Sequence, residues 1–365
     1  MPDGPRAVAV NPLPWVAGGE TTLLRLLPGL EARGWRMSAT VPARGRLGDA
    51  LEASGVPVRR LPLGPPQRRS AGSYAGALAA PAVLRGNDVC LLNGLSTQRS
   101  MGALRLLGTP AVLLVNNPIE QPPPRWDDPR HWQTVRAVAA ASDHVAAECR
   151  AAGAPPELVH TAYPAAWDGP APPGAAAPPP AGQHVGFVGQ LEPRKGVLEL
   201  IEAAGAFLAG RPEARLTIIG EAASADDAYA AEVRRAAAAL ERVELAGFRA
   251  DAAGAMAGFD LVVVPSLAEP YGTVSAEAAA AGRPAVISAV GGMAEVVLDG
   301  VTGLQVPPGD PAALAEALAA LLADPARQAV LAQHNLRQMQ ALTVEQTSAR
   351  YLDLFQQVSA RARRA

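Results

Sequence analysis

Residues 265–292 read PSLAEPYGTVSAEAAAAGRPAVISAVGG, and this stretch gives the clearest indication of the fold. One apolar run precedes it at 261–264 and another lies within it at 285–287; such short runs are typical of buried parallel strands. Between them the sequence predicts a helix over about 271–281, because the Gly-Arg-Pro that follows cannot continue one. The stretch therefore predicts a strand, a loop, a helix and a second strand of an α/β protein.

Two carboxylates of this unit, Glu269 and Glu277, stand eight residues apart, one before and one after the expected start of the helix. The backbone N–H groups of Gly272 and Thr273 lie at that start, where unpaired amides attract phosphate. Carboxylates beside them suit hydroxyl-rich groups such as ribose or a sugar. Together these features predict a nucleotide-sugar pocket.

The basic residues are almost all of one kind: thirty-one of the thirty-two are arginine, and Lys195 is the only lysine. Arg194 precedes it in the segment GFVGQLEPRKG (186–196), where an apolar strand ends in glycine and a helix begins near Gly196. Basic groups at the carboxyl end of a strand and next to a helix start are well placed to hold an anion. A compact ammonium at this position therefore predicts phosphate binding, with chance survival of one lysine as the alternative.

The bulk composition fits a protein of two domains with a sizeable core. The chain has 365 residues, of which 49% are apolar. A net charge of −2 argues against a nucleic-acid binder that relies on bulk electrostatics. Residues 1–165 hold 17 arginines against 12 acids (+5), and residues 166–365 hold 15 basic against 22 acidic residues (−7). A basic first half suits an anionic acceptor, a membrane surface or an ordinary solvated surface.

Targeting and metal-binding signals are weak. The N-terminus has no basic-then-apolar signal region and no run approaches the length of a membrane span, so a cytoplasmic location is expected, with peripheral membrane contact as the alternative. Two cysteines give no disulfide framework and no metal-site spacing. The adjacent acids Asp127-Asp128 and Asp226-Asp227 are typical of helix starts, so no catalytic metal is expected.

Apolar runs alternate with helical segments along nearly the whole chain, which indicates two parallel sheets covered on both faces. The strands are expected near 7–10, 37–41, 58–61, 88–92, 111–115, 144–146, 185–188, 215–219, 243–245, 261–264, 285–288 and 303–305. The helices are expected near 21–33, 47–53, 74–84, 98–107, 132–140, 197–209, 226–240, 250–256, 271–281, 311–322, 326–341 and 344–363.

This alternation predicts a Rossmann-like domain at 1–163, a Pro/Ala-rich linker at 164–184 and a second domain at 185–342, which contains the expected nucleotide-sugar pocket. A C-terminal helix at 343–365 closes the chain, with a return to the first domain as one possible course. Ligands of doubly wound sheets bind at the carboxyl ends of the strands. We therefore expect the site in a cleft between the two domains.

The ordered series of motifs over about 185–325 resembles the family 4 retaining glycosyltransferases, whose GT-B fold has two Rossmann-like domains facing across a cleft. The series matches in order and spacing, whereas the N-terminal match is confined to the Gly18-Gly19-Glu20 loop. Its members are the Gly189 turn with Lys195-Gly196, Pro265-Ser266, Glu269 and Glu277, Gly282-Arg283-Pro284, Gly291-Gly292 with Glu295, Gly300, Thr302-Gly303 and Pro308-Gly309-Asp310.

The resemblance implies a retaining, metal-independent transfer of a sugar from a nucleotide-diphosphate sugar to a hydroxyl of a glycan, lipid or small molecule, with no cofactor. Lys195, supported by Arg194, would hold the diphosphate, and Glu269 would hold a hydroxyl of the donor sugar. Glu277 would bind the ribose. The domain at 185–342 would hold the nucleotide sugar, and the domain at 1–163 would hold the acceptor. Further donor contacts are expected from Tyr271, Gly272, Thr273, Gly18, Gly19, Gln190, Phe248 and Arg249.

Two positions depart from the family pattern. Gln190 stands where an arginine often follows the glycine of the first turn, so Arg194 would have to replace that charge. Asn116-Asn117 stand where a histidine often follows the fifth strand, near the donor sugar. An amide can hydrogen-bond a sugar hydroxyl but cannot take up a proton at neutral pH. His131 and His144 are nearby in sequence, and we expect a surface role for the first and a structural role for the second.

Other interpretations stay open. A nucleotide-sugar 2-epimerase shares the two-domain architecture, and a non-catalytic subunit could bind nucleotide or glycan for a partner transferase. Each carboxylate alone also has a purely structural interpretation. Glu269 fits an acid that caps the helix, and Glu277 fits a solvated residue on the helix surface. Trp126 and Trp132 fit either sugar stacking at an acceptor site or ordinary packing of their loop.

Overall fold

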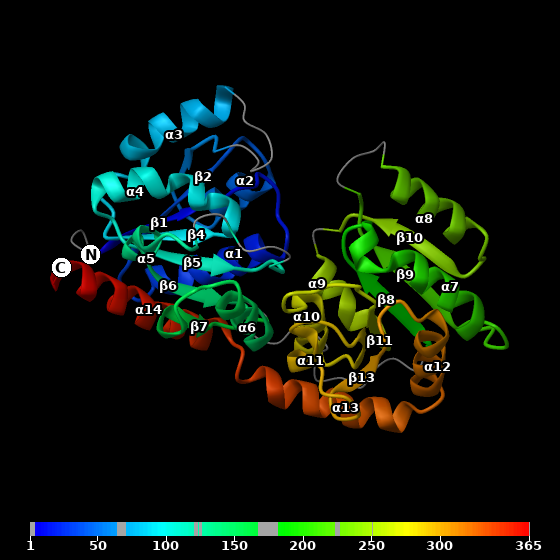
Figure 1. Ribbon diagram of the computed structural model, residues 1–365. Coiled ribbons are helices and arrows are strands. Elements are labelled where there is room, and N and C mark those ends of the chain that lie inside the picture. Colours follow the sequence, from blue (N-terminus) through cyan, green and yellow to red (C-terminus); the bar gives the residue numbers. More distant parts are fainter. Residues whose placement is uncertain are drawn as a thin grey trace. The chain divides into compact units, whose positions relative to one another are not determined.

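The computed structural model describes residues 4–63, 71–119, 123, 126–166, 182–222, 227–249 and 251–364. The chain forms two compact units, one made of residues up to Ala165 together with the C-terminal helix from Val344, and one made of Ala166–Thr343 (Figure 1). Most of the expected linker, residues 167–181, lies outside the described residues.

The first unit is built on a parallel sheet which, within the described residues, has seven strands in the order β3-β2-β1-β4-β5-β6-β7. Its strands are β1 (Arg6–Val10), β2 (Arg36–Val41), β3 (Val58–Arg60), β4 (Val89–Asn93), β5 (Ala111–Val115), β6 (Val135–Ala140) and β7 (Val159–Thr161). Its helices are α1 (Gly18–Glu31), α2 (Arg46–Ala53), α3 (Ala71–Leu84), α4 (Met101–Leu107), α5 (Pro129–Thr134), α6 (Asp143–Ala151) and α14 (Val344–Arg364), with short 3-10 turns at Leu95–Ser100 and Pro156–Leu158.

Alternate side chains of these strands enter two different cores, because successive residues of a strand point to opposite faces of the sheet. In β1, Ala7 and Ala9 pack toward α1, α2 and α14, whereas Val8 and Val10 pack toward α3, α4 and α6. Both faces are therefore buried, which explains why the central strands are apolar throughout.

Helix α14 belongs to the first unit although it ends the chain. It packs along α1, and the ring of Phe355 meets that of Trp35 edge-on with centroids 5.0 Å apart. Arg33 of the segment after α1 donates to the Glu345 carbonyl at 3.0 Å. The apolar stripe of α14 thus completes one core of the first unit.

The second unit has a parallel sheet of six strands among the described residues, in the order β10-β9-β8-β11-β12-β13. Its strands are β8 (His184–Val188), β9 (Arg215–Ile219), β10 (Val243–Gly247), β11 (Leu261–Val264), β12 (Ala285–Ser288) and β13 (Gly303–Val306). Its helices are α7 (Val197–Phe207), α8 (Ala228–Ala238), α9 (Ala252–Ala255), α10 (Thr273–Ala280), α11 (Met293–Val296), α12 (Pro311–Leu322) and α13 (Pro325–Met339), with 3-10 turns at Pro193–Lys195 and Met256–Gly258.

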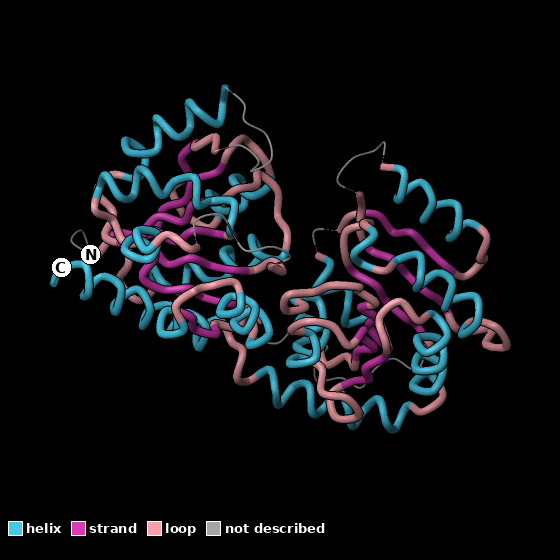
Figure 2. Tube along the Cα trace, in the orientation of Figure 1, coloured by secondary structure: helices cyan, strands magenta, loops and turns pink. Residues whose placement is uncertain are grey.

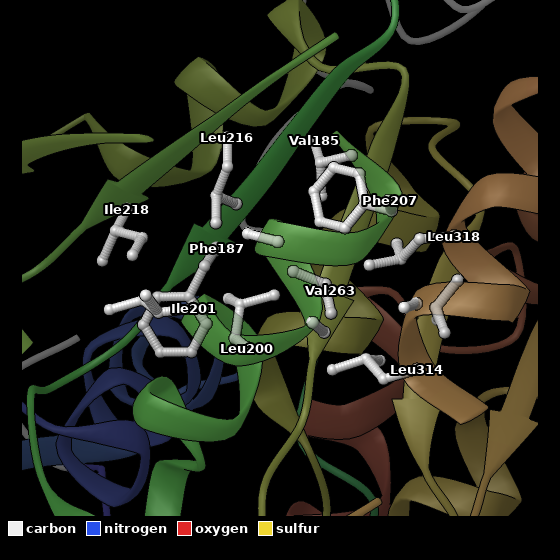
Figure 3. Close-up of a cluster of buried hydrophobic side chains, with 14 of the residues drawn as sticks. Val185, Phe187, Leu200, Ile201, Phe207, Leu216, Ile218, Val263, Leu314 and Leu318 are labelled. Atoms are coloured by element: carbon white, nitrogen blue, oxygen red, sulfur yellow. The ribbon is translucent and has the colours of Figure 1, made fainter. Parts of the chain in front are cut away.

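One core of this unit lies between the sheet and helices α7, α8 and α12. Figure 3 shows Phe187 of β8 among Leu200 and Ile201 of α7, with Leu314 of α12 nearby. The magenta strands of Figure 2 lie between cyan helices within each unit, as expected for doubly wound sheets. Two Rossmann-like α/β units are therefore confirmed.

The largest error of the sequence analysis lies in residues 132–161. It expected a helix at 132–140, a strand at 144–146 and no strand at 159–161, where β7 lies. The run Val135–Ala140 is strand β6, paired between β5 and β7, and residues 144–146 lie in helix α6. Alanine-rich VRAVAA favours a helix by propensity, but burial between two strands decides its conformation. Helix α6 begins at a cap, because Ser142 Oγ accepts from the Val145 amide at 3.1 Å.

Candidate functional site

The second unit changes the direction of its strand order between β8 and β11, the two neighbouring central strands. The chain leaves β8 toward β9 and leaves β11 toward β12, so the loops after these strands diverge. In doubly wound sheets a crevice opens at such a switch point, outside the carboxyl ends of the strands. The loop 189–196 and the loop 265–272 meet there.

These two loops are held against each other by their backbones. Leu267 N donates to the Arg194 carbonyl at 2.8 Å, and Arg194 Nη1 donates to the Ala268 carbonyl at 3.1 Å. Gly196 has φ of +65°, and a Cβ built there would stand 2.0 Å from the carbonyl oxygen of Pro265. Only glycine permits both the left-handed conformation and this close approach.

A cluster of opposite charges joins the loops at the same place. Lys195 Nζ lies 2.5 Å from Glu269 Oε2, and Arg194 Nη1 lies 3.6 Å from the same oxygen. The side chains of Lys195 and Glu269 are only 15% and 11% exposed, so the pair is largely withdrawn from water. Arg194 also pairs with Glu192 of its own loop, at 2.6 Å. Its bond to the Ala268 carbonyl and its proximity to Glu269 connect it to the other loop.

Helix α10 begins directly after this cluster. Its N-cap is Gly272, with φ of +85°, and Ser275 Oγ donates to the Gly272 carbonyl at 2.7 Å. The helix starts at Thr273, two residues later than predicted, because the left-handed Gly272 turns the chain into it. Glu277 lies one turn into the helix and is 9% exposed, so it is a buried carboxylate and not a solvated helix residue.

The backbone of Glu269 is fixed by the segment after β12. Gly292 N donates to the Glu269 carbonyl at 3.2 Å, and a Cβ on Gly291, whose φ is +55°, would stand 1.9 Å from that oxygen. Gly291 and Gly292 of the sequence motif therefore have a structural reason. Without side chains, the segment after β12 can pass close to the backbone of the loop 265–272.

The other residues of this unit that were predicted to contact the donor do not belong to the charged cluster. Gln190 is partly buried in the turn after β8, and its carbonyl accepts from the Glu192 amide at 3.0 Å. Tyr271 is 3% exposed and packs inside the unit. Phe248, 51% exposed, and the exposed Arg249 follow the edge strand β10, two strands away from β8.

The first unit has its own switch point, between β1 and β4, and polar side chains meet there. Asn93, at the end of β4, donates from Nδ2 to Glu20 Oε1 and to Asn11 Oδ1, both at 3.1 Å. Its own Oδ1 accepts from Asn116 Nδ2 at 3.0 Å. A Cβ on Gly19 would stand 2.8 Å from Asn116 Nδ2. Gly18 and Gly19 are the first residues of α1 and not part of a loop, as the sequence analysis expected. Asn116, which Asn93 holds in place, lies against this start of the helix.

Glu20 anchors this network. It is 4% exposed, its Oε2 accepts from the Ala17 amide at 3.3 Å, and burial raises the pKa of its carboxyl. Because both of its oxygens accept, Asn93 must turn its amide nitrogen toward Glu20 and its oxygen toward Asn116. The sequence analysis did not identify Asn11, Asn93 or the role of Glu20. The asparagines could have been found from their positions, because Asn11 directly follows the apolar strand β1 and Asn93 ends the apolar strand β4. Asn117, beside Asn116, is exposed.

The rings of Trp126, His131 and Trp132 pack against one another. His131 is 1% exposed, so the expected surface role was wrong: its ring lies 4.7 Å from that of Trp132. Trp126 is 3% exposed and accepts through its carbonyl from Trp132 Nε1 at 2.9 Å, which favours ordinary loop packing over sugar stacking. His144 stands partly exposed on α6, 3.3 Å from Glu148.

The adjacent acids cap helices. Asp128 Oδ1 accepts from the Arg130 amide at 2.9 Å at the start of α5, and Asp227 Oδ1 accepts from the Ala230 amide at 3.1 Å at the start of α8. Asp226 lies outside the described residues. Across the described part of the chain, no group of three or more His, Cys, Asp or Glu side chains is arranged to hold a metal ion. Likewise, none of the described helices is long and apolar enough to cross a membrane.

Most of the second unit matches a known sequence family. Residues 182–324 match the family described as glycosyl transferases group 1. Glycogen synthase of Mycobacterium tuberculosis is 41% identical over 149 residues, which cover 38% of this chain and 34% of that protein. D-inositol 3-phosphate glycosyltransferase of Xylanimonas cellulosilytica is 44% identical over 102 residues, covering 28% of this chain and 24% of that protein. The chain thus spans about a third or less of these relatives' lengths.

Comparison with solved structures covers both units. Anabaena HepE in complex with UDP and glucose has a TM-score of 0.83 and 21% identity, over 96% of this chain and 99% of that one. Sucrose-phosphate synthase from Thermosynechococcus elongatus has a TM-score of 0.76 and 21% identity, over 98% and 99%. The chain therefore has the fold of these two structures, the GT-B fold, which consists of two Rossmann-like domains.

Proposed function

We propose that this chain is a retaining glycosyltransferase that moves a sugar from a nucleotide-diphosphate sugar to an acceptor hydroxyl, without a metal ion. The observation that carries the proposal is the meeting of Lys195, Glu269 and the N-terminus of α10 at the switch point of the second unit. The match of residues 182–324 to the group 1 glycosyltransferases supports it.

The diphosphate would bind between Lys195 and the first amides of α10. An ammonium has three hydrogens, and the pair with Glu269 uses one of them, so Lys195 can hold a phosphate oxygen without leaving its partner. A cation about 4 Å from a phosphate oxygen gains roughly 4 kcal/mol of Coulomb energy at an effective dielectric of 20. The N-terminus of α10 adds the attraction of its backbone N–H groups.

These contacts assist the reaction because charge grows on the leaving group. As the bond between the sugar C1 and the diphosphate oxygen breaks, negative charge builds on the phosphate that Lys195 faces. The acceptor oxygen forms the new bond to C1 on the same face, and its proton passes to the departing phosphate oxygen. Such a path needs no side-chain base, which suits a cluster of carboxylates and cations without a paired histidine.

The two carboxylates would divide the rest of the donor between them. Glu269 would accept a hydrogen bond from a hydroxyl of the sugar while its ion pair keeps Lys195 in place. Glu277, buried one turn into α10, would accept the ribose hydroxyls. Both roles need an ionised acceptor oriented by its surroundings, and burial together with fixed loops provides that orientation.

A uridine nucleotide is the first donor to test. HepE, which shares the fold of this chain, has been crystallised with UDP-glucose. We therefore propose a UDP-hexose donor and leave the acceptor as a hydroxyl compound of the glycan, lipid or small-molecule class.

Titration calorimetry with UDP and UDP-glucose tests the proposal. Lys195→Ala and Glu277→Ala should each weaken UDP binding at least tenfold, that is by about 1.4 kcal/mol or more. Arg234→Ala and Glu202→Ala are matched controls, because these exposed residues carry the same charges on helices α8 and α7. Wild-type affinity in both site variants would refute the assignment.

Product analysis then separates the alternatives. NMR of UDP-glucose with the enzyme and a panel of hydroxyl acceptors should show a new glycosidic bond with the anomeric configuration of the donor. An epimerase would interconvert the donor with no acceptor present. A non-catalytic subunit would bind the donor and produce neither change.

A further inference from the structure

The positive charge of the first unit is concentrated in one segment. Residues 54–119 contain seven arginines and one acid, Asp88, whereas the rest of residues 1–165 contains ten arginines and eleven acids. The whole excess of the first 165 residues therefore comes from this segment, which includes helices α3 and α4.

Helix α3 presents apolar side chains to solvent as well as to the core. Its sequence, AGSYAGALAAPAVL, has no charged residue. Ala80 and Leu84 are buried in the core, while Leu78 is 83% exposed and is flanked by exposed alanines. A helix that is apolar on all sides is normally covered on all sides.

Helix α4 adds a second exposed leucine. It packs against α3 (Figure 1), and its Leu106 is 76% exposed. Among the large apolar side chains of the described residues, Leu78 and Leu106 are the two most exposed. Both helices bury other side chains in the same core, so Leu78 and Leu106 both stand on the solvent side of the α3–α4 pair.

Arginines border this surface. Arg59 Nη1 donates to the Val83 carbonyl near the end of α3, at 3.3 Å, and Arg60 beside it is exposed. Arg85 follows α3 directly and is exposed. Within the described ranges, no ion pair joins Arg59, Arg60 or Arg85 to an acidic side chain. Their charges are therefore available to an anionic partner.

We propose that the outer face of α3, with Leu106 of α4 and the bordering arginines, is a docking surface for an anionic lipid bilayer. Apolar side chains can enter the boundary between headgroups and acyl chains while arginines remain with the anionic headgroups. An acidic protein with an apolar face is the alternative occupant, and it predicts no binding of the wild type to anionic vesicles. The inference stands apart from the donor site, since it concerns other elements of the chain.

Vesicle flotation tests this surface. The wild-type chain should float with vesicles in which a third of the lipid is phosphatidylglycerol and should not float with phosphatidylcholine vesicles. High salt should reduce the bound fraction, because it screens the arginine charges. A double change, Leu78→Glu with Leu106→Glu, should lower the bound fraction about tenfold, since two acids replace the inserting side chains.

The control is Val330→Glu, which places the same acid at a side chain that is 53% exposed in the second unit. Arg59→Glu with Arg60→Glu provides a second test that leaves the leucines intact, and it should also reduce flotation. Circular dichroism and UDP binding check that each variant is folded.

Failure of the wild type to bind anionic vesicles would overturn the proposal, as would equal flotation of the Leu78→Glu/Leu106→Glu variant and the Val330→Glu control. Sedimentation that shows a concentration-dependent dimer, abolished by the leucine changes and accompanied by no vesicle binding, would assign the surface to a second copy of this chain instead.

Discussion

Replacing Gly196 by alanine probes the contact on which the candidate site depends. A Cβ at this position would stand 2.0 Å from the Pro265 carbonyl oxygen, which belongs to the loop after β11. The neighbour is backbone and not the end of a flexible side chain, so the loop 265–272 must move away from Lys195. Gly210→Ala is the matched control: its φ of +72° is close to the +65° of Gly196, and nothing lies within 4 Å of its added Cβ.

The expected magnitude follows from two separate costs. A left-handed alanine costs about 1–2 kcal/mol, and both variants bear this cost. Overpacking costs typically about 1–3 kcal/mol more, and only Gly196→Ala bears it. Urea unfolding should therefore show Gly196→Ala to be less stable than Gly210→Ala by about 1–3 kcal/mol.

Donor binding gives the second readout of the same pair of variants. Displacing the loop moves the first amides of α10 away from Lys195. Because the diphosphate is proposed to bind between these groups, the affinity for UDP should fall at least tenfold in Gly196→Ala and stay unchanged in Gly210→Ala. Equal stability and equal UDP affinity in the two variants would refute the inferred contact between the loops.

Three further predictions concern single groups. Glu269→Gln should keep UDP affinity near the wild-type value, because Lys195 remains, but should lower turnover of UDP-glucose at least tenfold; an unchanged turnover would remove Glu269 from the reaction. Gly19→Ala should cost little stability, since the added Cβ meets the movable end of Asn116 at 2.8 Å, yet should raise the KM for the sugar donor without changing the Kd of UDP. For His184, burial lowers the pKa to about 4, so the neutral ring is favoured in the folded state. The stability that this preference provides is present above the unfolded pKa of about 6.5 and is lost as the pH falls toward 4. His184 is half-exposed, so His184→Gln should reduce that loss by only about 1 kcal/mol, measured by urea unfolding at several pH values; an identical pH profile in the variant would contradict this.

Much of the second unit was predictable from sequence because its strands are short, continuous apolar runs separated by helices. The predicted run 261–264 matches β11 in full, and the predicted helix at 271–281 differs from α10 by two residues at its start and one at its end. The left-handed Gly272 explains the late start, since a glycine before a helix fits either the N-cap or the first turn.

The first unit shows where pattern alone fails. Residues 135–140 resemble a helix because alanine dominates them, and only pairing with β5 and β7 makes them a strand. A single sequence contains no signal for such pairing. The polar network under Gly19 was missed for a related reason: Asn11, Asn93 and Asn116 are far apart in the chain, and the sheet order brings them together.

The charged cluster was predicted in its members but not in its arrangement. Lys195 and Glu269 were expected to contact different parts of a ligand, and the structure pairs them directly at 2.5 Å. Arg194, expected as a support for phosphate, also pairs with Glu192 of its own loop and donates to the Ala268 carbonyl of the other loop. The spacing of the sequence motifs predicts which side chains belong to the same site. Which of these side chains contact each other directly depends on how the loops pack.

A crystal structure of the chain with UDP-glucose tests the central claim most directly. The account predicts the diphosphate within hydrogen-bonding distance of Lys195 Nζ and of the first amides of α10, with the ribose on Glu277 and the hexose on Glu269. A diphosphate bound elsewhere, with the Lys195–Glu269 pair unchanged and facing no ligand, would contradict it.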